Sequence, residues 1–305
     1  MTDETLAGNS RAAGDGAPLV SVIIPHHNDL ANLKRCIDLL AAQTVPRSQF
    51  EIVVADNNSS CGLTEVESAC GALARVVPAP VQGAGPARNA AIAASLGDIL
   101  AFTDSDCRPA RDWLERGLAA LSNVDADLVG GRVDVDVGDP AHPTAVEAFE
   151  IVFAFNLKRY VERLSFSAAA NMFVPREIFD RVGPFRARVT EDLEWGKRAS
   201  AANYRWRYAA NVVVTHPARS TWAELWRKWR RRSEEDFELA LEHPLGRAIW
   251  LLRSFAILGS PFVHWFFVVR SNKLRGVPQR LMAIAVLFRI RFRRFIECYR
   301  LLLRH

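Results

Sequence analysis

The stretch Asp98-Ile-Leu-Ala-Phe-Thr-Asp104-Ser-Asp106 decides the fold class of this chain. It is a short apolar run followed at once by two carboxylates, and such a run is typical of a buried parallel strand. Similar runs occur at 19–25, ended by Pro25, and at 50–55, followed by Asp56. Stretches with helical spacing separate these runs. The sequence therefore predicts βαβ units and an α/β fold with a mostly parallel sheet flanked by helices.

The same reasoning extends along the chain. Helices are expected at 29–42, 64–74, 83–95, 109–121, 144–164, 176–182 and 191–201, and further strands at 75–77, 168–175 and 206–215. From Arg132 to Val137 valine and aspartate alternate, which predicts a strand with one face in water. Ligands of such sheets bind at the carboxyl ends of the strands. We therefore expect Asn28, Asp56 and the Asp104–Asp106 pair to converge on one cleft.

Asp104 and Asp106 form a dense negative patch directly after a strand. Two carboxylates two residues apart are costly to desolvate unless they are paired or bind a cation. A hard divalent ion with oxygen ligands suits them, and Mg²⁺ or Mn²⁺ would leave positions open for substrate phosphates. The competing interpretation is a solvated turn, because Asp-x-Asp is common by chance.

Three other motifs contain candidate functional residues. In Gly83-Ala-Gly-Pro-Ala-Arg88 the glycines would let the backbone approach a ligand and Arg88 would hold a phosphate, or the motif is only a helix cap with a surface arginine. In the pair Glu191-Asp192 one carboxylate would be a catalytic base, or both only complement a helix dipole with Thr190 as N-cap. His216 follows a strand and would contact a metal or phosphate, or only make a structural hydrogen bond. The same two interpretations apply to His26 and His27, which follow the first strand.

Composition excludes several classes of protein. The chain has 305 residues, half of them hydrophobic, with 17 Gly, 15 Pro and 5 Cys. This excludes a disordered chain, a collagen-like repeat and a disulfide scaffold. The absence of Cys-x-x-Cys makes a zinc knuckle unlikely, and the cysteine usage suits a reducing compartment.

Charge is segregated along the chain. Residues 1–200 carry 19 basic and 27 acidic side chains, a net charge of −8, whereas residues 201–305 carry 20 and 7, a net charge of +13. The basic residues of the second segment alternate with large apolar blocks. This favours an anionic membrane surface over nucleic acid as the partner, with intramolecular packing as the alternative.

Two segments within the basic residues 201–305 are candidates for membrane contact. Trp222, Leu225, Trp226 and Trp229 share one face of an expected helix among basic residues, which is typical of an interfacial helix, although a packed helix has the same pattern. The segment 249–269 contains Arg253 and Pro261 and is better suited to an interfacial or re-entrant helix than to a full span. A buried core helix is the alternative.

The polar first 18 residues lack an apolar core and are expected to be a disordered leader rather than a signal peptide. The expected organisation is thus a leader at 1–18, a catalytic domain at 19–220 and a basic amphipathic helical extension at 221–305. We expect the protein to stay in the cytoplasm, peripheral on the inner face of the membrane.

Several motifs in a fixed order point to a known family. They are Val20-Ser-Val-Ile-Ile-Pro25 with Asn28, Ile52-Val-Val-Ala-Asp56, Gly85-Pro-Ala-Arg88-Asn89, Phe102-Thr-Asp104-Ser-Asp106, Asn171-Met-Phe-Val-Pro-Arg176, Val182-Gly-Pro-Phe185 and Glu191-Asp192. This set resembles the family 2 inverting glycosyltransferases of the GT-A fold, which is Rossmann-like. The resemblance covers residues 19–220 and implies a nucleotide-sugar donor and a divalent metal.

The resemblance also implies roles for single residues. Pro25 and Asn28 would lie near the nucleoside, Asp56 would bind the base, typically uracil, and Arg88 would lie by the diphosphate. A further group would hold the metal or do the chemistry: Asp104 at the ribose or the metal, Asp106 and His216 at the metal, and Asp192 of the Glu191-Asp192 pair as the base that deprotonates the acceptor hydroxyl.

Some positions depart from the family pattern. His26 and His27 stand where a small polar residue and Tyr are usual. Ala55-Asp56-Asn57 stands where Asp-Asp-Gly is usual, and this second departure weakens the prediction that the base is uracil. The multi-span channel and a clear Gln-x-x-Arg-Trp box of polysaccharide synthases are missing, so a non-processive enzyme is expected.

We therefore expect a membrane-surface glycosyltransferase with a lipid-linked or polysaccharide acceptor. The rival interpretations are a nucleotidyltransferase of similar fold, a degenerate nucleotide-sugar-binding protein and a nucleic-acid binder.

Overall fold

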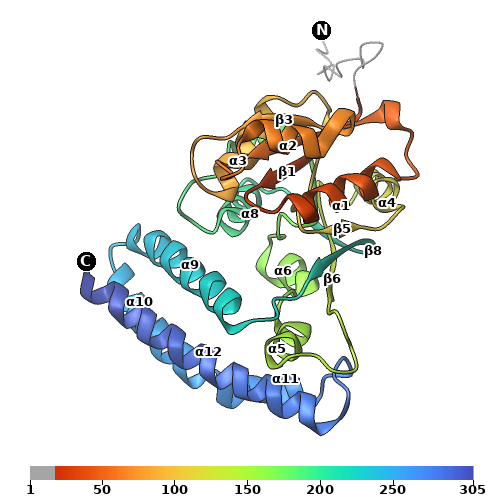
Figure 1. Ribbon diagram of the computed structural model, residues 1–305. Coiled ribbons are helices and arrows are strands. Elements are labelled where there is room, and N and C mark those ends of the chain that lie inside the picture. Colours follow the sequence, from red (N-terminus) through yellow and green to blue (C-terminus); the bar gives the residue numbers. More distant parts are fainter. Residues whose placement is uncertain (1–17, 305) are drawn as a thin grey trace.

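The expected alternation of strands and helices is present in the computed structural model, which describes residues 18–304 and contains one eight-stranded sheet in this range (Figure 1). The strands are β1 (Val20–His26), β2 (Phe50–Asp56), β3 (Arg75–Pro78), β4 (Ile99–Phe102), β5 (Arg108–Pro109), β6 (Leu128–Asp136), β7 (Met172–Pro175) and β8 (Trp206–Pro217). The α-helices are α1 (Leu30–Ala41), α2 (Leu63–Cys70), α3 (Ala84–Ala93), α4 (Trp113–Leu121), α5 (Ala145–Phe153), α6 (Leu157–Leu164), α7 (Arg176–Val182), α8 (Glu191–Ala201), α9 (Trp222–Leu241), α10 (Gly246–Gly259), α11 (Pro261–Val269) and α12 (Gly276–Arg304).

The sheet has the order β3-β2-β1-β4-β7-β6-β8-β5. β3, β2, β1 and β4 pair in parallel, and so do β6 and β8, whereas β7 is antiparallel to both of its neighbours and β5 to β8. Thr103 and the Asp104–Asp106 turn follow β4, next to the carboxyl end of β1. The expected α/β class is confirmed, with an antiparallel strand inserted at the centre of the sheet.

Helices cover both faces of the parallel half because its strands are apolar on both sides. Val22 and Ile24 of β1 pack with α1, α2 and α4 on one face. Ile23 packs on the other face with α3, α7 and α8, where Trp195 of α8 is fully buried. This doubly covered sheet holds the strand ends in fixed positions.

Several expected elements have different bounds. The helix expected at 144–164 is two helices, α5 and α6, because Asn156 breaks it by capping α6: its side chain accepts a hydrogen bond from the Arg159 N–H at 3.3 Å. The helix expected from Pro109 begins at Trp113, since Pro109 pairs with β8. The strand expected from Ala168 begins at Met172.

The C-terminal helices form a separate layer at the opposite end of the molecule from β1, β2 and β3 (Figure 1). α12 packs against α5, α9, α10 and α11. The apolar face of α9 that contains Trp222, Trp226 and Trp229 lies against Val286, Leu287 and Ile290 of α12. That face is therefore packed within the protein, and the membrane-facing interpretation of the Trp stripe is wrong.

Within residues 18–304 no single helix is long and apolar enough to cross a membrane. α10 and α11 would reach that length only as a pair, and they are bent by 42° at the break before Pro261. Their outer surfaces are apolar and exposed. The expected leader, residues 1–18, lies outside the described residues except for Pro18.

Candidate active site

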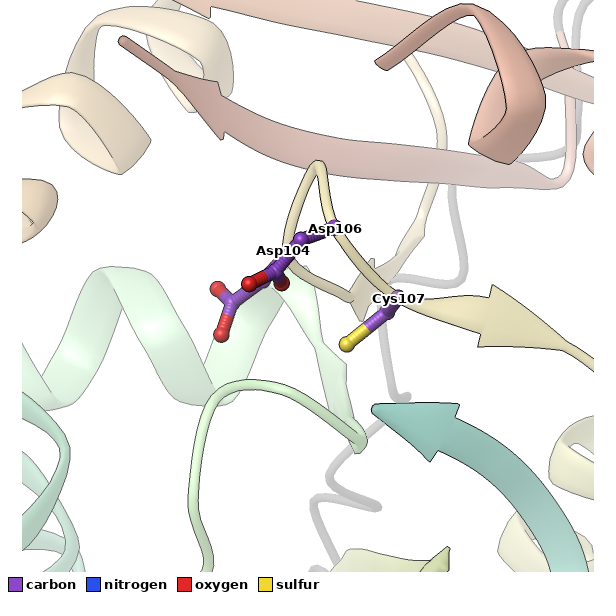
Figure 2. A group of neighbouring side chains, drawn as sticks. All are labelled: Asp104, Asp106 and Cys107. Carbon is purple, nitrogen blue, oxygen red and sulfur yellow. The ribbon is translucent and has the colours of Figure 1, made fainter. Parts of the chain in front are cut away.

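The turn after β4 presents the two carboxylates to the same side. Asp104 and Asp106 leave this turn with their oxygen atoms close together, and Cys107 lies below them (Figure 2). One ligand atom from each of the three lies within 4.8 Å of the others. Burial raises the pKa of the Cys107 thiol well above its usual value, as do Asp104 and Asp106. The thiol therefore stays protonated, and the carboxylates are the better ligands for a cation.

His216, at the end of β8, completes this group. Its Nε2 lies 3.3 Å from Oδ2 of Asp106, and its Nδ1 lies 2.7 Å from the carbonyl oxygen of Pro217. Because a carbonyl oxygen only accepts hydrogen bonds, Nδ1 has to donate, and a neutral ring then turns its Nε2 lone pair toward Asp106. Two acceptors at this distance repel one another unless a proton or a metal ion lies between them.

Asp106 has a second oxygen without a partner. Its Oδ1 is buried and makes no hydrogen bond within residues 18–304. Burial raises the pKa of Asp106, while His216 lowers it. A divalent cation held by Asp104, Asp106 and His216 would satisfy both Oδ1 of Asp106 and the His216 lone pair, so these residues fit such an ion.

Arg88 connects the two acidic motifs. It is buried in α3, and its guanidinium donates to Oδ1 of Asp104 and to Oε1 of Glu191, both at 2.6 Å. Burial lowers the pKa of Arg88, but the two carboxylates raise it by more, so the net change is upward. The close approach of α3 to Glu191 requires Gly85, since a Cβ there would lie 3.1 Å from the Cβ of Glu191.

Glu191 is thus neutralised by Arg88, whereas its neighbour Asp192 makes no ion pair within the described chain. Among residues 18–304, Asp192 accepts a hydrogen bond only from the Leu193 N–H, at 2.7 Å. Burial and the Glu191 charge raise the pKa of Asp192 to about 6, against the lowering effect of Arg232 and Arg88. A carboxylate with such a pKa is mostly ionised at neutral pH and basic enough to take a proton, which suits a general base.

Thr190 precedes this pair as the N-cap of α8, but its side chain does not cap the helix. Its hydroxyl donates instead to Oδ1 of Asp236 in α9, at 3.1 Å. This contact ties the start of α8 to the C-terminal helices.

Asp56 and His26 lie side by side at the ends of β2 and β1. Oδ2 of Asp56 accepts the Ser59 N–H at 3.2 Å, whereas its Oδ1 is buried without a partner within residues 18–304. Both ring nitrogens of the buried His26 also lack partners there. Burial lowers the pKa of His26, so the ring is neutral. These unpaired groups are available to a ligand.

Pro25 and Asn28 shape the loop beside this pair. Pro25 lies beyond Ile23, the last residue of β1 that pairs with β4, so it removes no ladder hydrogen bond on that side. Asn28 has a φ of 55°, a left-handed conformation that asparagine tolerates. Its Oδ1 accepts from the N–H and the hydroxyl of Ser60, at 2.7 and 3.0 Å. Asn28 thus holds two loops together.

α9 and the loop before it add two cations that were not expected from the sequence. Lys228 of α9 and Arg219 both pair with the buried Glu150, each at 3.2 Å, which leaves one positive charge in excess. Lys228 lies over Phe155, and Phe155 packs against His216. Burial lowers the pKa of Lys228 to about 8. The signal in the sequence was the basic run after Trp226, which we assigned to a surface.

Comparison with known proteins identifies the family of this chain. Residues 21–193 match the family model described as glycosyl transferase family 2. Glycosyltransferase AglE of Haloferax volcanii is 34% identical over 250 residues, which cover 78% of this chain and 81% of that protein. The pre-mycofactocin glycosyltransferase of Mycobacterium tuberculosis is 26% identical over 312 residues, and the match covers 98% of this chain but only 62% of that protein.

Among solved structures, mannosyltransferase PcManGT from Pyrobaculum calidifontis, in complex with GDP-Man and Mn2+, superimposes with a TM-score of 0.60 at 18% identity. The match covers 93% of this chain and 86% of that one, and it shows the shared GT-A fold. The family-model match spans more than half of the 305 residues. The chain belongs to glycosyl transferase family 2 and is a transferase that uses a nucleotide-sugar donor.

Proposed function

We propose that this enzyme transfers a sugar, with inversion, from a uridine-linked donor to a hydroxyl group of a lipid-linked or polysaccharide acceptor. The observation that carries the proposal is the contrast between the two adjacent carboxylates at the start of α8. Arg88 holds Glu191 as a charged partner, while Asp192 remains free with a pKa near 6. One carboxylate therefore anchors the site and the other is available to accept a proton.

In this mechanism Asp192 takes the proton of the acceptor hydroxyl as the hydroxyl oxygen attacks the anomeric carbon. A new carbon–oxygen bond forms on one face of the sugar, and the bond to the diphosphate oxygen breaks on the opposite face, which inverts the centre. The electron pair of the broken bond leaves with the nucleoside diphosphate. Lys228 and Arg219, with one positive charge in excess over Glu150, are placed to attract that diphosphate.

A divalent ion, Mg²⁺ or Mn²⁺, would supply charge neutralisation for the leaving diphosphate. Asp104, Asp106 and His216 would hold it. Arg88 orients Asp104 for this task, because it occupies Oδ1 and leaves the second oxygen free.

The choice of uracil rests on the unpaired groups at the ends of β1 and β2. Oδ1 of Asp56 is one free acceptor, because Oδ2 is taken by Ser59. Uracil offers one ring N–H between two carbonyl oxygens, so a single acceptor and a ring N–H from His26 complement it. Guanine would present two adjacent donors and would need both oxygens of Asp56.

The basic helical extension, residues 221–305, is proposed to lie on an anionic membrane surface at the cytoplasmic side. Large apolar side chains are exposed on α10, α11 and α12, including Leu252 at 72% and Phe262 at 71%. Arg270, Lys273 and Arg304 belong to the same layer. Apolar contact combined with basic charge is what holds interfacial helices to anionic lipid.

Liposome sedimentation tests this placement. We expect binding to anionic vesicles at low salt, little binding to zwitterionic ones, and a large loss for the double variant Leu252→Ser with Phe262→Ser. Val81→Ser removes an equally apolar, exposed side chain far from this layer and serves as the control. Equal binding of both variants would contradict the placement.

The catalytic proposal is tested by nucleotide release from a panel of nucleotide sugars, with Mn²⁺, Mg²⁺ or EDTA. We expect slow metal-dependent hydrolysis of a uridine-linked donor that is lost in Asp106→Asn. Asp134→Asn, on the exposed edge of β6, is the matched control. A failure of every donor to bind or turn over with metal would instead indicate a catalytically degenerate fold. Formation of a nucleoside triphosphate and a sugar phosphate when pyrophosphate is added would indicate a nucleotidyltransferase.

A further inference from the structure

Two arginines of α12 lie against Trp229 without an acidic partner. The guanidinium carbon of Arg294 is 4.1 Å from the centre of the Trp229 ring, and that of Arg291 is 5.7 Å away. Arg294 is 4% exposed. Within residues 18–304 neither arginine has a carboxylate within ion-pair distance. A buried guanidinium normally has one, because its charge is otherwise uncompensated.

The nearest acids are already occupied. Asp236 of α9 attracts Arg294 electrostatically, but its oxygens pair with Arg232 at 3.3 Å and Arg253 at 2.5 Å, and one also accepts from Thr190. Glu297, one turn further along α12, pairs with Arg230 and Arg300. Burial and the charge of Arg291 lower the pKa of Arg294 to about 9, against the raising effect of Asp236.

The hydrogen-bond donors of this cluster are also without acceptors. The Nε atoms of Arg291 and Arg294 and the indole nitrogen of Trp229 are buried and unpartnered in the described chain, as is Nδ1 of the neighbouring His264 in α11. Arginine and tryptophan nitrogens only donate. Both guanidinium groups lie within 6 Å of the Trp229 ring, and none of the three side chains offers an acceptor. Such a group of donors is complementary to an oxyanion.

We infer that Arg291, Arg294 and Trp229 form a binding site for a phosphate-type oxyanion between α9 and α12. Arg291, Trp229 and His264 are half-buried, and His264 belongs to α11, which carries exposed apolar side chains such as Phe262. Trp229 is one residue from Lys228 and one helical turn from Arg232, which influences Asp192. The site is thus suited to the phosphate of an amphiphilic acceptor, an extension that rests on the proposed function.

The test is titration of the full chain in EDTA with sodium phosphate at constant ionic strength, followed by calorimetry and by the indole N–H resonance of Trp229. That resonance is assigned with Trp229→Phe. We expect phosphate to shift it and Arg294→Met to weaken phosphate binding about tenfold or more, the loss expected for one charge-assisted hydrogen bond. Arg289→Met removes an arginine that stacks on Trp222, about two turns from Trp229 in α9, and should leave binding unchanged.

Thermal unfolding without phosphate separates a ligand site from a structural one. A ligand site predicts that Arg294→Met melts at or above the wild-type temperature, because an uncompensated buried charge is removed. A structural arginine predicts a lower melting temperature and no change in the response to phosphate. That result, or phosphate binding that does not depend on Arg294, would overturn the inference.

A second ligand distinguishes the sources of the phosphate. Decyl phosphate in uncharged maltoside micelles should bind at least tenfold more tightly than inorganic phosphate if the site takes a lipid headgroup, and equally tightly if it takes free phosphate. Both results support an oxyanion site provided that Arg294→Met abolishes them. The phosphate titration contains no sugar donor and no metal. It can therefore fail while donor hydrolysis succeeds, and donor hydrolysis can fail while phosphate still binds.

Discussion

Arg88 in the sheet region and Arg294 in the C-terminal helices are buried to nearly the same extent, at 3% and 4% exposure. Arg88 contacts two carboxylates, and the net effect on its pKa is upward. Arg294 contacts an indole ring, and its pKa falls to about 9. The same side chain at the same depth therefore has opposite electrostatic surroundings, and the partner rather than the burial decides what it does.

The difference extends to the regions around them. In the sheet region buried charges of opposite sign are brought together by strand ends, and a few carboxylate atoms are left free for ligands. In the helical layer arginines of α12 stack on tryptophans of α9: Arg289 on Trp222, Arg293 on Trp226 and Arg294 on Trp229. We expect substitutions in the first region to have large effects and those in the stacked helices to have small ones.

The largest effect is expected at Asp192. Asp192→Asn keeps the shape of the side chain but cannot accept the acceptor proton, so kcat should fall by about 10²–10⁴-fold. Donor binding should stay within twofold of wild type. Steady-state kinetics and donor titration measure the two quantities, with Asp180→Asn on the exposed side of α7 as control. A comparable loss in donor affinity would show that Asp192 binds the donor rather than accepting the proton of the acceptor hydroxyl.

Arg88→Met tests the charge pairing in the sheet region. It leaves Asp104 and Glu191 without their shared cation, and breaking a buried pair in this way costs about 3–5 kcal/mol of unfolding free energy. Urea denaturation measures it. Arg75→Met, which removes an exposed partner of Glu51, should cost less than about 1 kcal/mol. If Arg88→Met lowered the free energy of unfolding as little as Arg294→Met, the two arginines would not differ in their contribution to stability.

The pH profile gives a smaller effect. Asp192 has to be ionised to act as a base, and its pKa is about 6. The ionised fraction, and with it kcat/KM, should be half-maximal near pH 6 and fall about tenfold per pH unit below it. Activity measured from pH 5 to 8, at saturating metal, checks this. A flat profile over that range would remove Asp192 from the role of base.

The smallest effect is expected in the tryptophan–arginine stack. Arg293 lies 4.8 Å from the centre of the half-buried Trp226 ring, and such a contact is worth about 0.5–1 kcal/mol. A double-mutant cycle of Arg293→Met and Trp226→Leu should give a coupling free energy of that size. Coupling above about 2 kcal/mol would mean that stacking, rather than apolar packing on α12, holds this layer together.

The sequence by itself determined the strand-end residues. Asp56, Asp104 and Asp106 each follow an apolar run, and parallel strands bring such ends to one edge of a sheet whatever the rest of the chain does. The alternation of strands and helices was equally local. For this reason the α/β class followed expectation.

Only the tertiary structure decided what each charge contacts. Arg88 was expected beside a diphosphate and lies between Asp104 and Glu191, 16 and 103 residues away in sequence. The Trp stripe of α9 was predicted to be interfacial, with a packed helix as the alternative, and it packs on α12. An amphipathic pattern shows that a face is buried but not against what, because lipid and a second helix satisfy the same apolar side chains.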